Sequence, residues 1–305
     1  MASLREIRLR VDSVKNTKKI TYAMKLVAAA KLKRAQEAAQ RGRLYTDQLN
    51  QMAAALISEL GSDGITSPYL ATEEGTESSS SRRKKALLLV FGGGRGLCGG
   101  YNTNLNRQLE VWVKETERTC DVELVLVGRK PAEYCRRVGR PYLEAFEQVP
   151  EDAAKWPIEE VAALIERKFL AGEVNEVFFL FTKFKSAISM TPTISRVLPM
   201  DASALVVAQP TATGSSTSNG VTLFEPSAQE VFSALLPRLL RSKLRQGAFD
   251  AKASETGARM TAMDAATKNA GELIDKLTRL RNKLRQNGIT SQLLDIVGGA
   301  EAVNN

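Results

Sequence analysis

Two features of the sequence predict an α/β domain combined with long helices. Apolar and small residues recur in steps of three and four through both ends of the 305-residue chain, which is typical of helices that pack along one another. Short apolar runs alternate with helical stretches through the middle of the chain, as in an α/β domain. We therefore expect the two end segments to form an asymmetric antiparallel coiled coil, with the α/β domain inserted between them in the sequence.

Composition narrows the possible classes of protein. Hydrophobic residues make up 43% of the chain, which is enough for a sizeable core. No apolar run reaches the ~18 residues of a transmembrane helix, and the N-terminus lacks the apolar core of a signal peptide. We therefore expect the chain to stay in the compartment where it is made. The sequence contains no histidine, the commonest general base and metal ligand, and this disfavours an enzyme active site.

Charge and cysteine usage add two expectations. Residues 1–60 hold 12 Lys and Arg against 5 Asp and Glu, residues 227–305 hold 12 against 8, and the whole chain carries +9. The basic surface therefore belongs to the two ends, which suggests an acidic partner there: nucleic acid, a lipid surface or protein. Cys98, Cys120 and Cys135 lack CxxC spacing and suit a reducing compartment, so we expect free thiols.

The first helix is expected over residues 3–60. Ser3 and Glu6 form a capping-box pattern that predicts its start. Apolar and small residues then keep the helical spacing, interrupted only by Gly42, which costs about 1 kcal/mol in a helix interior. The large residues expected on this seam are Leu4, Ile7, Val11, Val14, Ile20, Met24, Val27, Leu49, Met52, Leu56 and Leu60, with an Ala-rich stretch between them. At 1.5 Å per residue the helix is about 80 Å long, more than a compact domain needs.

A Gly-, Ser- and Thr-rich connector over residues 61–85 leads into the α/β domain, which we expect over residues 86–210. Continuous apolar runs predict strands buried on both faces, as in a parallel sheet. The expected strands are 86–91, 122–127 and 177–181, and the expected helices are 103–117, 131–138 and 158–170. Residues 191–197 and 205–207 are expected as additional strands, for which an edge position is one option. Residues 211–226 are expected to form a loop.

The second long helix is expected over residues 227–305. It begins at a second capping box, Ser227 to Glu230, and Pro237 is expected to kink its first turns. Asn287-Gly288 is a turn dipeptide, which disfavours helix continuity at that point. The seam expected to pack on the first helix consists of Met260, Met263, Thr267, Ala270, Ile274, Leu277 and Leu284, with Arg281 filling one position.

A glycine-rich segment follows the first strand and allows two interpretations. Gly94, Gly96 and Gly99 fit the GxGxxG pattern of a dinucleotide site, in the required strand–glycine–helix context. The acidic residue expected after the second strand is missing, because Gly128-Arg129-Lys130 stands there; an arginine could instead accept the 2′-phosphate of NADP. The other interpretation, which we favour, is that the glycines permit a tight turn packed against neighbouring backbone.

Three segments together resemble a known family. They are IRLRVDSVKNTKKITYAMKLVAAAKLKR at residues 7–34, GRGLCGGYN at 94–102, and SETGARMTAMDAATKNAGELIDKLTRLRNKLRQNGITSQLLDIVGG at 254–299. In this order and spacing they closely resemble the gamma subunit of the rotary F-type ATP synthase. The chain lacks the cysteine-bearing insertion of that family's redox-regulated branch, because no cysteine follows Cys135.

The resemblance implies a fold, a function and partners. It implies a coiled-coil shaft with an inserted Rossmann-like domain, which transmits torque between a membrane ring of c subunits and a catalytic hexamer of alpha and beta subunits. The implied role couples ion translocation to ATP synthesis or hydrolysis, with the epsilon subunit as a further partner. No catalytic residue, cofactor, metal, nucleic acid or direct small-molecule ligand is implied. The implied location is peripheral, on the cytoplasmic face of the energy-coupling (inner or plasma) membrane.

The resemblance also implies contact residues. Met24 matches the methionine of the family's AMxxVAA motif, a position associated with coupling to the beta subunit. Arg285, Gln286 and Thr290 match the RQxxIT segment, which contacts a beta-subunit loop through polar side chains. Two other classes remain open from the residues alone: a nucleic-acid binder that uses the basic ends, and an NADP-linked oxidoreductase that uses the glycine-rich segment. The first lacks a nucleic-acid-binding signature and interleaved aromatics.

Overall fold

The structure, a computed structural model, describes residues 4–60, 67–71, 83–202 and 224–304. The chain forms two compact units: residues 1–30 with 259–305, and residues 31–258. Both long helices run through both units. The segment boundaries inferred from composition stay predictions, because the connector and the loop fall largely outside the described residues. The additional strand expected at 205–207 also lies outside them.

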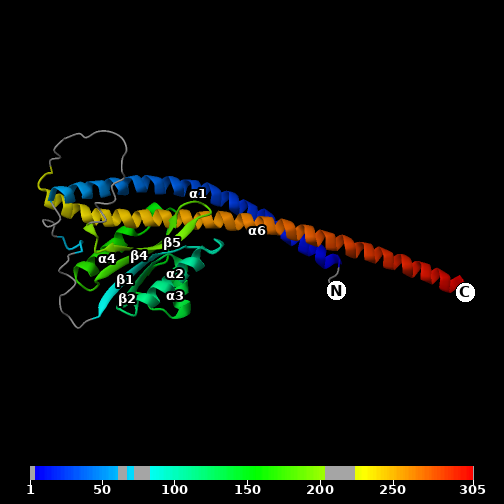
Figure 1. Ribbon diagram of the computed structural model, residues 1–305. Helices are drawn as coiled ribbons and strands as arrows, with labels where there is room; N and C mark the ends of the chain where they lie inside the picture. Colours follow the sequence, from blue (N-terminus) through cyan, green and yellow to red (C-terminus); the bar gives the residue numbers. More distant parts are fainter. Residues whose placement is uncertain (1–3, 61–66, 72–82, 203–223, 305) are drawn as a thin grey trace. The chain divides into compact units, whose positions relative to one another are not determined.

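The two long helices are α1 (Leu4–Leu60) and α6 (Ala228–Asn304), drawn in blue and in yellow to red in Figure 1. The Glu230 amide donates to the Ser227 hydroxyl at 3.2 Å, as the second capping box predicts; Ser3, which belongs to the first, lies outside the described residues. α6 runs without a break through Pro237 and through Asn287-Gly288.

The doubt about continuity at Asn287-Gly288 is therefore resolved in favour of helix. A turn dipeptide costs only about 1 kcal/mol within a helix, and no atom lies within 4 Å of the position a Gly288 side chain would take. At Pro237 the lost hydrogen bond is offset by burial. Leu235, Leu236 and Leu239 around it are at most 5% exposed.

The larger unit contains a five-stranded sheet in the order β3-β2-β1-β4-β5. Its strands are β1 (Lys84–Phe91), β2 (Cys120–Val127), β3 (Glu144–Phe146), β4 (Glu176–Phe184) and β5 (Met190–Leu198). The first four are parallel, and β5 pairs antiparallel with β4 at the edge. The predicted strands are confirmed within this sheet. No apolar run in the sequence marks β3, which is short and not fully buried.

Helices cover both faces of this sheet (Figure 1). They are α2 (Tyr101–Thr116), α3 (Arg129–Val138) and α4 (Ile158–Leu170), with a short 3-10 turn at Ala153–Lys155. Even-numbered residues of β1, such as Leu88 and Val90, pack with α2 and α3. Odd-numbered residues, such as Leu89 and Phe91, pack with α4 and with α6. This alternation follows from the two-residue period of a strand.

Within the larger unit, α1 and α6 form part of the second core. Four of their side chains are fully buried, at 0% exposure: Ala53 and Leu56 of α1, and Leu240 and Leu244 of α6. Met52, expected on the seam, is instead 49% exposed. The three- and four-residue spacing runs through Ala53, because a small residue lets the two helices approach closely.

In the smaller unit, α1 and α6 form the expected antiparallel pair. Residue numbers fall along α1 as they rise along α6. The pairs that show this are Lys25 with Asp264, Thr21 with Thr267 and Lys18 with Gly271. All eight residues predicted for the α6 seam, from Met260 to Leu284, are buried or half-buried. On α1 the prediction was wrong at Ile20 and Val27, which are 60% and 55% exposed.

The α1 error has a physical cause. Thr21 takes the inward position next to Ile20, where the Thr267 hydroxyl donates to the Thr21 hydroxyl at 2.9 Å. A polar residue that finds a partner across the seam costs little to bury. A rule that selects only apolar residues therefore chose the neighbour on the outer face.

Candidate partner-binding site

The four residues expected to contact a partner lie in the smaller unit, in two separate groups. Met24 is half-buried on α1, one turn from the Thr21–Thr267 contact. Arg285, Gln286 and Thr290 are exposed on α6, beyond the last residue of the seam. Since Lys25 lies opposite Asp264, Met24 and Arg285 are separated by about 20 residues of helix, or roughly 30 Å. The structure therefore does not bring the two groups together.

An ion-pair cluster lies next to Met24. The Lys25 ammonium donates to the Asp264 carboxylate at 2.7 Å, and Lys268 lies 3.3 Å from the other oxygen of the same carboxylate. The hydrogen bond from Lys25 holds the pKa of Asp264 below its usual range, and the hydrogen bond to Asp264 raises the pKa of Lys25. Lys25 and Asp264 therefore both stay charged at neutral pH. The cluster fixes the pairing register of the two helices at the level of Met24.

The second group sits on a single helix surface. Gln286 and Thr290 are four residues apart and share one face of α6, with Arg285 beside them. The Thr290 hydroxyl donates to the Gln286 carbonyl at 3.0 Å, which leaves its methyl group and an oxygen lone pair directed outward. The guanidinium of Arg285 and the amide of Gln286 remain available for a partner with carboxylate or carbonyl oxygens.

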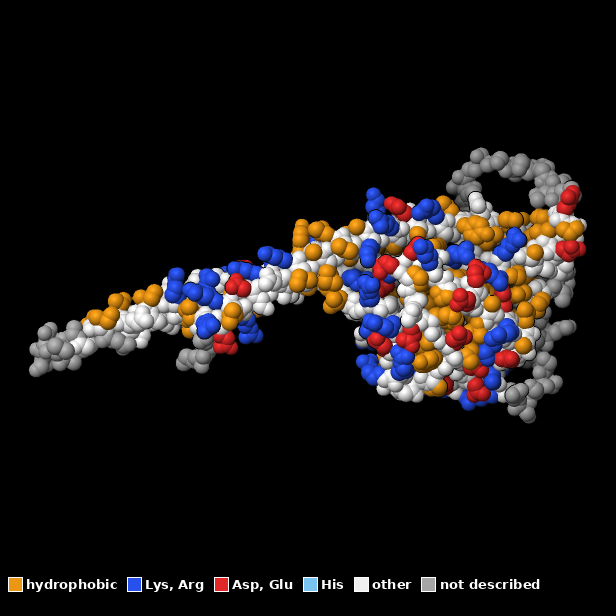
Figure 2. All heavy atoms as spheres, turned by 180° about the vertical axis from the view of Figure 1, so that it is seen from behind, with side chains coloured by type: hydrophobic (Ala, Val, Ile, Leu, Met, Phe, Trp, Pro, Cys, Tyr) orange, Lys and Arg blue, Asp and Glu red, His pale blue; other side chains and the backbone are white. Residues whose placement is uncertain are grey.

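An apolar stripe continues past this group and was missed in the sequence. Ile289, Leu293, Ile296 and Val297 are 52% to 68% exposed and keep the helical spacing on one side of α6. Figure 2 shows orange side chains along this part of the helix, next to the grey end. Exposed apolar side chains gathered in this way mark a surface that another protein covers. A new three- and four-residue count that begins at Ile289 would have found them.

The glycine-rich segment has a different setting from a dinucleotide site. A side chain at Gly93 would lie 2.7 Å from the Asn102 amide oxygen and 3.5 Å from Glu255 of α6. The Tyr101 hydroxyl donates to the Ala251 carbonyl of α6 at 3.2 Å. Residues of α6 thus lie beside Gly93, just before the GxGxxG glycines and near the carboxyl end of β1, where a doubly wound fold binds its cofactor.

The backbone also explains the glycines directly. Gly128 has a φ of +105°, and a side chain there would lie 2.5 Å from the Gly92 carbonyl oxygen. This contact packs the backbone just before the motif, and within the motif Gly99 has a φ of +56°, which favours the second interpretation, a tight turn. The contact of Gly93 with Glu255 of α6 weighs against an NADP-linked oxidoreductase, because α6 lies beside the place that the cofactor would need.

The cysteines and the acidic residues add limited chemistry. All three cysteines are free, with Cys98 and Cys135 buried, and burial raises the pKa of Cys135 to about 11. Within the described ranges no three acidic or cysteine side chains gather closely enough to hold a metal ion. No helix in those ranges is both long and apolar enough to cross a bilayer.

Geometry of this kind defines a class of protein: two long antiparallel helices with an α/β domain inserted between them in the chain. The comparisons with known proteins identify the family. The family model described as ATP synthase matches residues 3–303. The ATP synthase gamma chain of Desulfitobacterium hafniense is 38% identical over 303 residues, covering 99% of this chain and all of that one. The chain belongs to the ATP synthase gamma chain family.

Further relatives and solved structures agree with this membership. The ATP synthase gamma chain of Synechococcus elongatus is 38% identical over 323 aligned residues, covering both chains fully. A chain of the Euglena gracilis mitochondrial ATP synthase, from a structure described as OSCP/F1/c-ring, superimposes with a TM-score of 0.64 at 20% identity, covering 98% of this chain and 94% of that one. A chain of the Euglena rotor structure gives 0.60 at 15% identity, covering 94% and 98%. At such identities the structural likeness speaks for the fold.

Proposed function

We propose that this chain is the central rotor shaft of an F-type ATP synthase. It transmits torque between the membrane c ring and the catalytic hexamer of alpha and beta subunits, and so couples ion translocation to ATP synthesis or hydrolysis. The observation that carries the proposal is the antiparallel pair of long, unlike helices in a chain 38% identical over its full length to a gamma chain.

The asymmetry of the pair supports the role. A contact with the rotor changes the nucleotide affinity of a catalytic subunit only if the contact stabilises one conformation of that subunit more than another. α1 and α6 present different side chains around the shaft, so three beta subunits placed around it would each meet a different surface at a given angle. A symmetric shaft would offer no such difference.

The partner contacts are assigned by region. Met24, Arg285, Gln286 and Thr290 contact the beta subunits, and the bare end of α6 with its apolar stripe lies within the hexamer. The α/β domain meets the epsilon subunit and the c ring, so the chain is peripheral to the cytoplasmic face of the energy-coupling membrane. It supplies no catalytic residue, cofactor or metal, and binds neither nucleic acid nor a small molecule.

Reconstitution tests the proposal. Mixed with the matching alpha and beta subunits, the chain should form a complex with one copy per three alpha–beta pairs and strong ATPase activity. Size-exclusion chromatography gives the stoichiometry, and ATP hydrolysis gives the activity. If alpha and beta hydrolyse ATP at the same rate with and without the chain, the proposal is wrong.

A further inference from the structure

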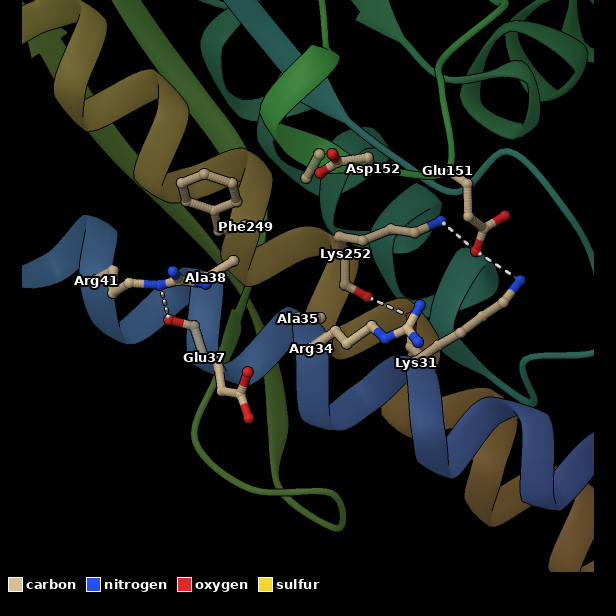
Figure 3. A pocket seen from close by; sticks show the side chains of 12 residues that line it. Lys31, Arg34, Ala35, Glu37, Ala38, Arg41, Glu151, Asp152, Phe249 and Lys252 are labelled. Atoms are coloured by element: carbon tan, nitrogen blue, oxygen red, sulfur yellow. Dashed lines mark hydrogen bonds and ion pairs between the residues drawn. The ribbon is translucent and has the colours of Figure 1, made fainter.

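One acidic side chain of the α/β domain contacts both long helices. Glu151 Oε1 lies 3.1 Å from the Lys31 ammonium of α1 and 3.4 Å from the Lys252 ammonium of α6. Lys252 also lies 3.2 Å from Glu255 on its own helix. Figure 3 shows the two lysines approaching Glu151 from the two helices. We call Lys31, Glu151 and Lys252 the clasp; all three belong to the larger unit.

The backbone that carries Glu151 is fixed to the sheet. The Trp156 indole donates to the Pro150 carbonyl at 3.1 Å, and the ring of Trp156 packs edge-on against Phe91 of β1 with centroids 5.5 Å apart. The Asp152 carboxylate caps the short 3-10 turn by accepting from the Ala154 amide at 3.0 Å. Glu151 therefore extends from a rigid support and not from a free loop.

The two helices are attached to the α/β domain unequally. Arg241 of α6 forms a two-pronged pair with Glu166 at 2.8 Å and a further contact with Glu159 at 2.9 Å. The Ser254 hydroxyl of α6 donates to the Thr182 carbonyl of β4 at 3.0 Å. Among the described residues of α1 in this unit, Lys31 alone makes a polar side-chain contact with the α/β domain.

The surroundings keep the Glu151 carboxylate charged but leave it accessible to dissolved ions. Burial pushes the pKa of Glu151 upward, but Lys252 and Lys31 outweigh this and leave the pKa below its usual value. The clasp residues line a cavity of about 450 Å³, together with Arg34 and Phe249. The Lys31 and Glu151 side chains are 41% and 44% exposed, so dissolved salt screens their attraction.

We propose that Glu151 is a positioning residue that locks α1 to α6 and to the same edge of the α/β domain, so that torque from the domain enters both helices and not α6 alone. This inference rests on the proposed rotor function. Without the clasp, α1 would follow the domain only through apolar packing, and the pair would twist more easily under load.

The first test compares three variants in the full chain by amide hydrogen exchange. Glu151→Gln removes the bridging charge at nearly constant shape, and Lys31→Gln removes only the arm on α1. Glu147→Gln is the control, because Glu147 pairs with Arg136 inside the α/β domain. The first two should speed exchange in residues 31–41 of α1 by about two- to fivefold, the range of an exposed ion pair. The control should leave these residues unchanged.

The second test uses the complete complex in vesicles. With Glu151→Gln the shaft should show larger torsional fluctuations in single-molecule rotation, and pumping against a steep ion gradient should fall, while ATP hydrolysis stays at the wild-type rate. In 1 M salt, where the screening length is about 3 Å, wild type and variant should converge.

The outcomes separate the two proposals. If the wild-type chain fails to activate alpha and beta, the rotor function is wrong. If it activates them but Glu151→Gln matches Glu147→Gln in exchange and in stiffness, the clasp is overturned. It is also overturned if Glu151→Gln speeds hydrogen exchange in α1 and Lys31→Gln does not, because the effect of Glu151 then does not depend on its contact with Lys31.

Discussion

The N-terminal part of α6, residues 228–258, and its C-terminal part, from residue 259 on, are packed in different ways. In residues 228–258 the helix is buried on several sides, with Leu236, Leu240 and Leu244 all at 0% exposure. In residues 265–284 only one stripe is covered, and residues 285–294 are exposed. Most helical stability in proteins comes from tertiary packing. One unbroken helix therefore has a firmly held base and an exposed stretch with little of that support.

The largest expected effect on the free energy of unfolding comes from shortening a buried leucine in each of the two parts of α6. Leu244→Ala should lower the free energy of unfolding by about 2–5 kcal/mol, because it leaves a cavity in a fully buried site. Leu277→Ala, in the half-buried upper seam, should cost less because solvent and helix movement relieve the loss. Urea unfolding followed by circular dichroism measures both. Equal costs at the two positions would contradict the comparison.

A glycine series should reverse the sign of the effect along the same helix. A side chain at Gly247 would lie 2.2 Å from the Phe179 ring, so Gly247→Ala should destabilise by about 1–3 kcal/mol through overpacking. Gly288 has open space around it, and Gly288→Ala should stabilise by up to about 1 kcal/mol through helix propensity. Thermal unfolding of the two variants decides the point, and a loss of stability at Gly288 would show that the bare end is packed.

Two aspartates on α6 should give opposite pH dependences. Burial raises the pKa of Asp250, against the nearby Arg43, so its ionisation opposes folding increasingly as pH rises above the unfolded value of about 3.9. The pKa of Asp264 is lowered by Lys25, so its contribution is present above that value and is lost as pH falls through the folded pKa.

Amide substitutions test this contrast. Asp250→Asn should become more stable than wild type as pH rises from 4 to 8, whereas Asp264→Asn should match wild type in strong acid, become less stable as pH rises to about 5, and keep that deficit up to pH 8. Urea unfolding at several pH values measures the two slopes. The same sign for both variants would mean that the two carboxylates do not sit in opposite environments.

The smallest effect on the folded chain is expected at the bare end. Replacing Arg285, Gln286 and Thr290 together by alanine should leave unfolding within about 0.5 kcal/mol of wild type, because the side chains are exposed. In the assembled complex the same variant should lower torque, measured by the load that stops rotation. Lys283→Ala, also exposed on α6, serves as the control. Unchanged torque would remove these residues from the partner contact.

The sequence predicted most of this arrangement and missed particular parts of it. The α6 seam from Met260 to Leu284 was predictable, because one covered stripe on a two-helix pair leaves a clear period. The α1 seam was not, since the polar Thr21 faces inward where a count of apolar residues selects Ile20. The clasp was also out of reach: Lys31, Glu151 and Lys252 are far apart in the chain, and nothing local distinguishes them from other surface charges.

The packing of α6 against one face of the sheet has a consequence for biosynthesis. α6 is a 77-residue helix at the end of the sequence, and at about 5–20 residues per second it takes several seconds to emerge from the ribosome. During that interval the sheet and α4 are complete, but the part of the apolar face around Leu89, Phe91 and Phe179 that α6 covers is still exposed. The nascent chain therefore passes through an aggregation-prone intermediate with exposed apolar surface. We expect a chaperone that shields this face until α6 is complete to raise the yield of folded protein.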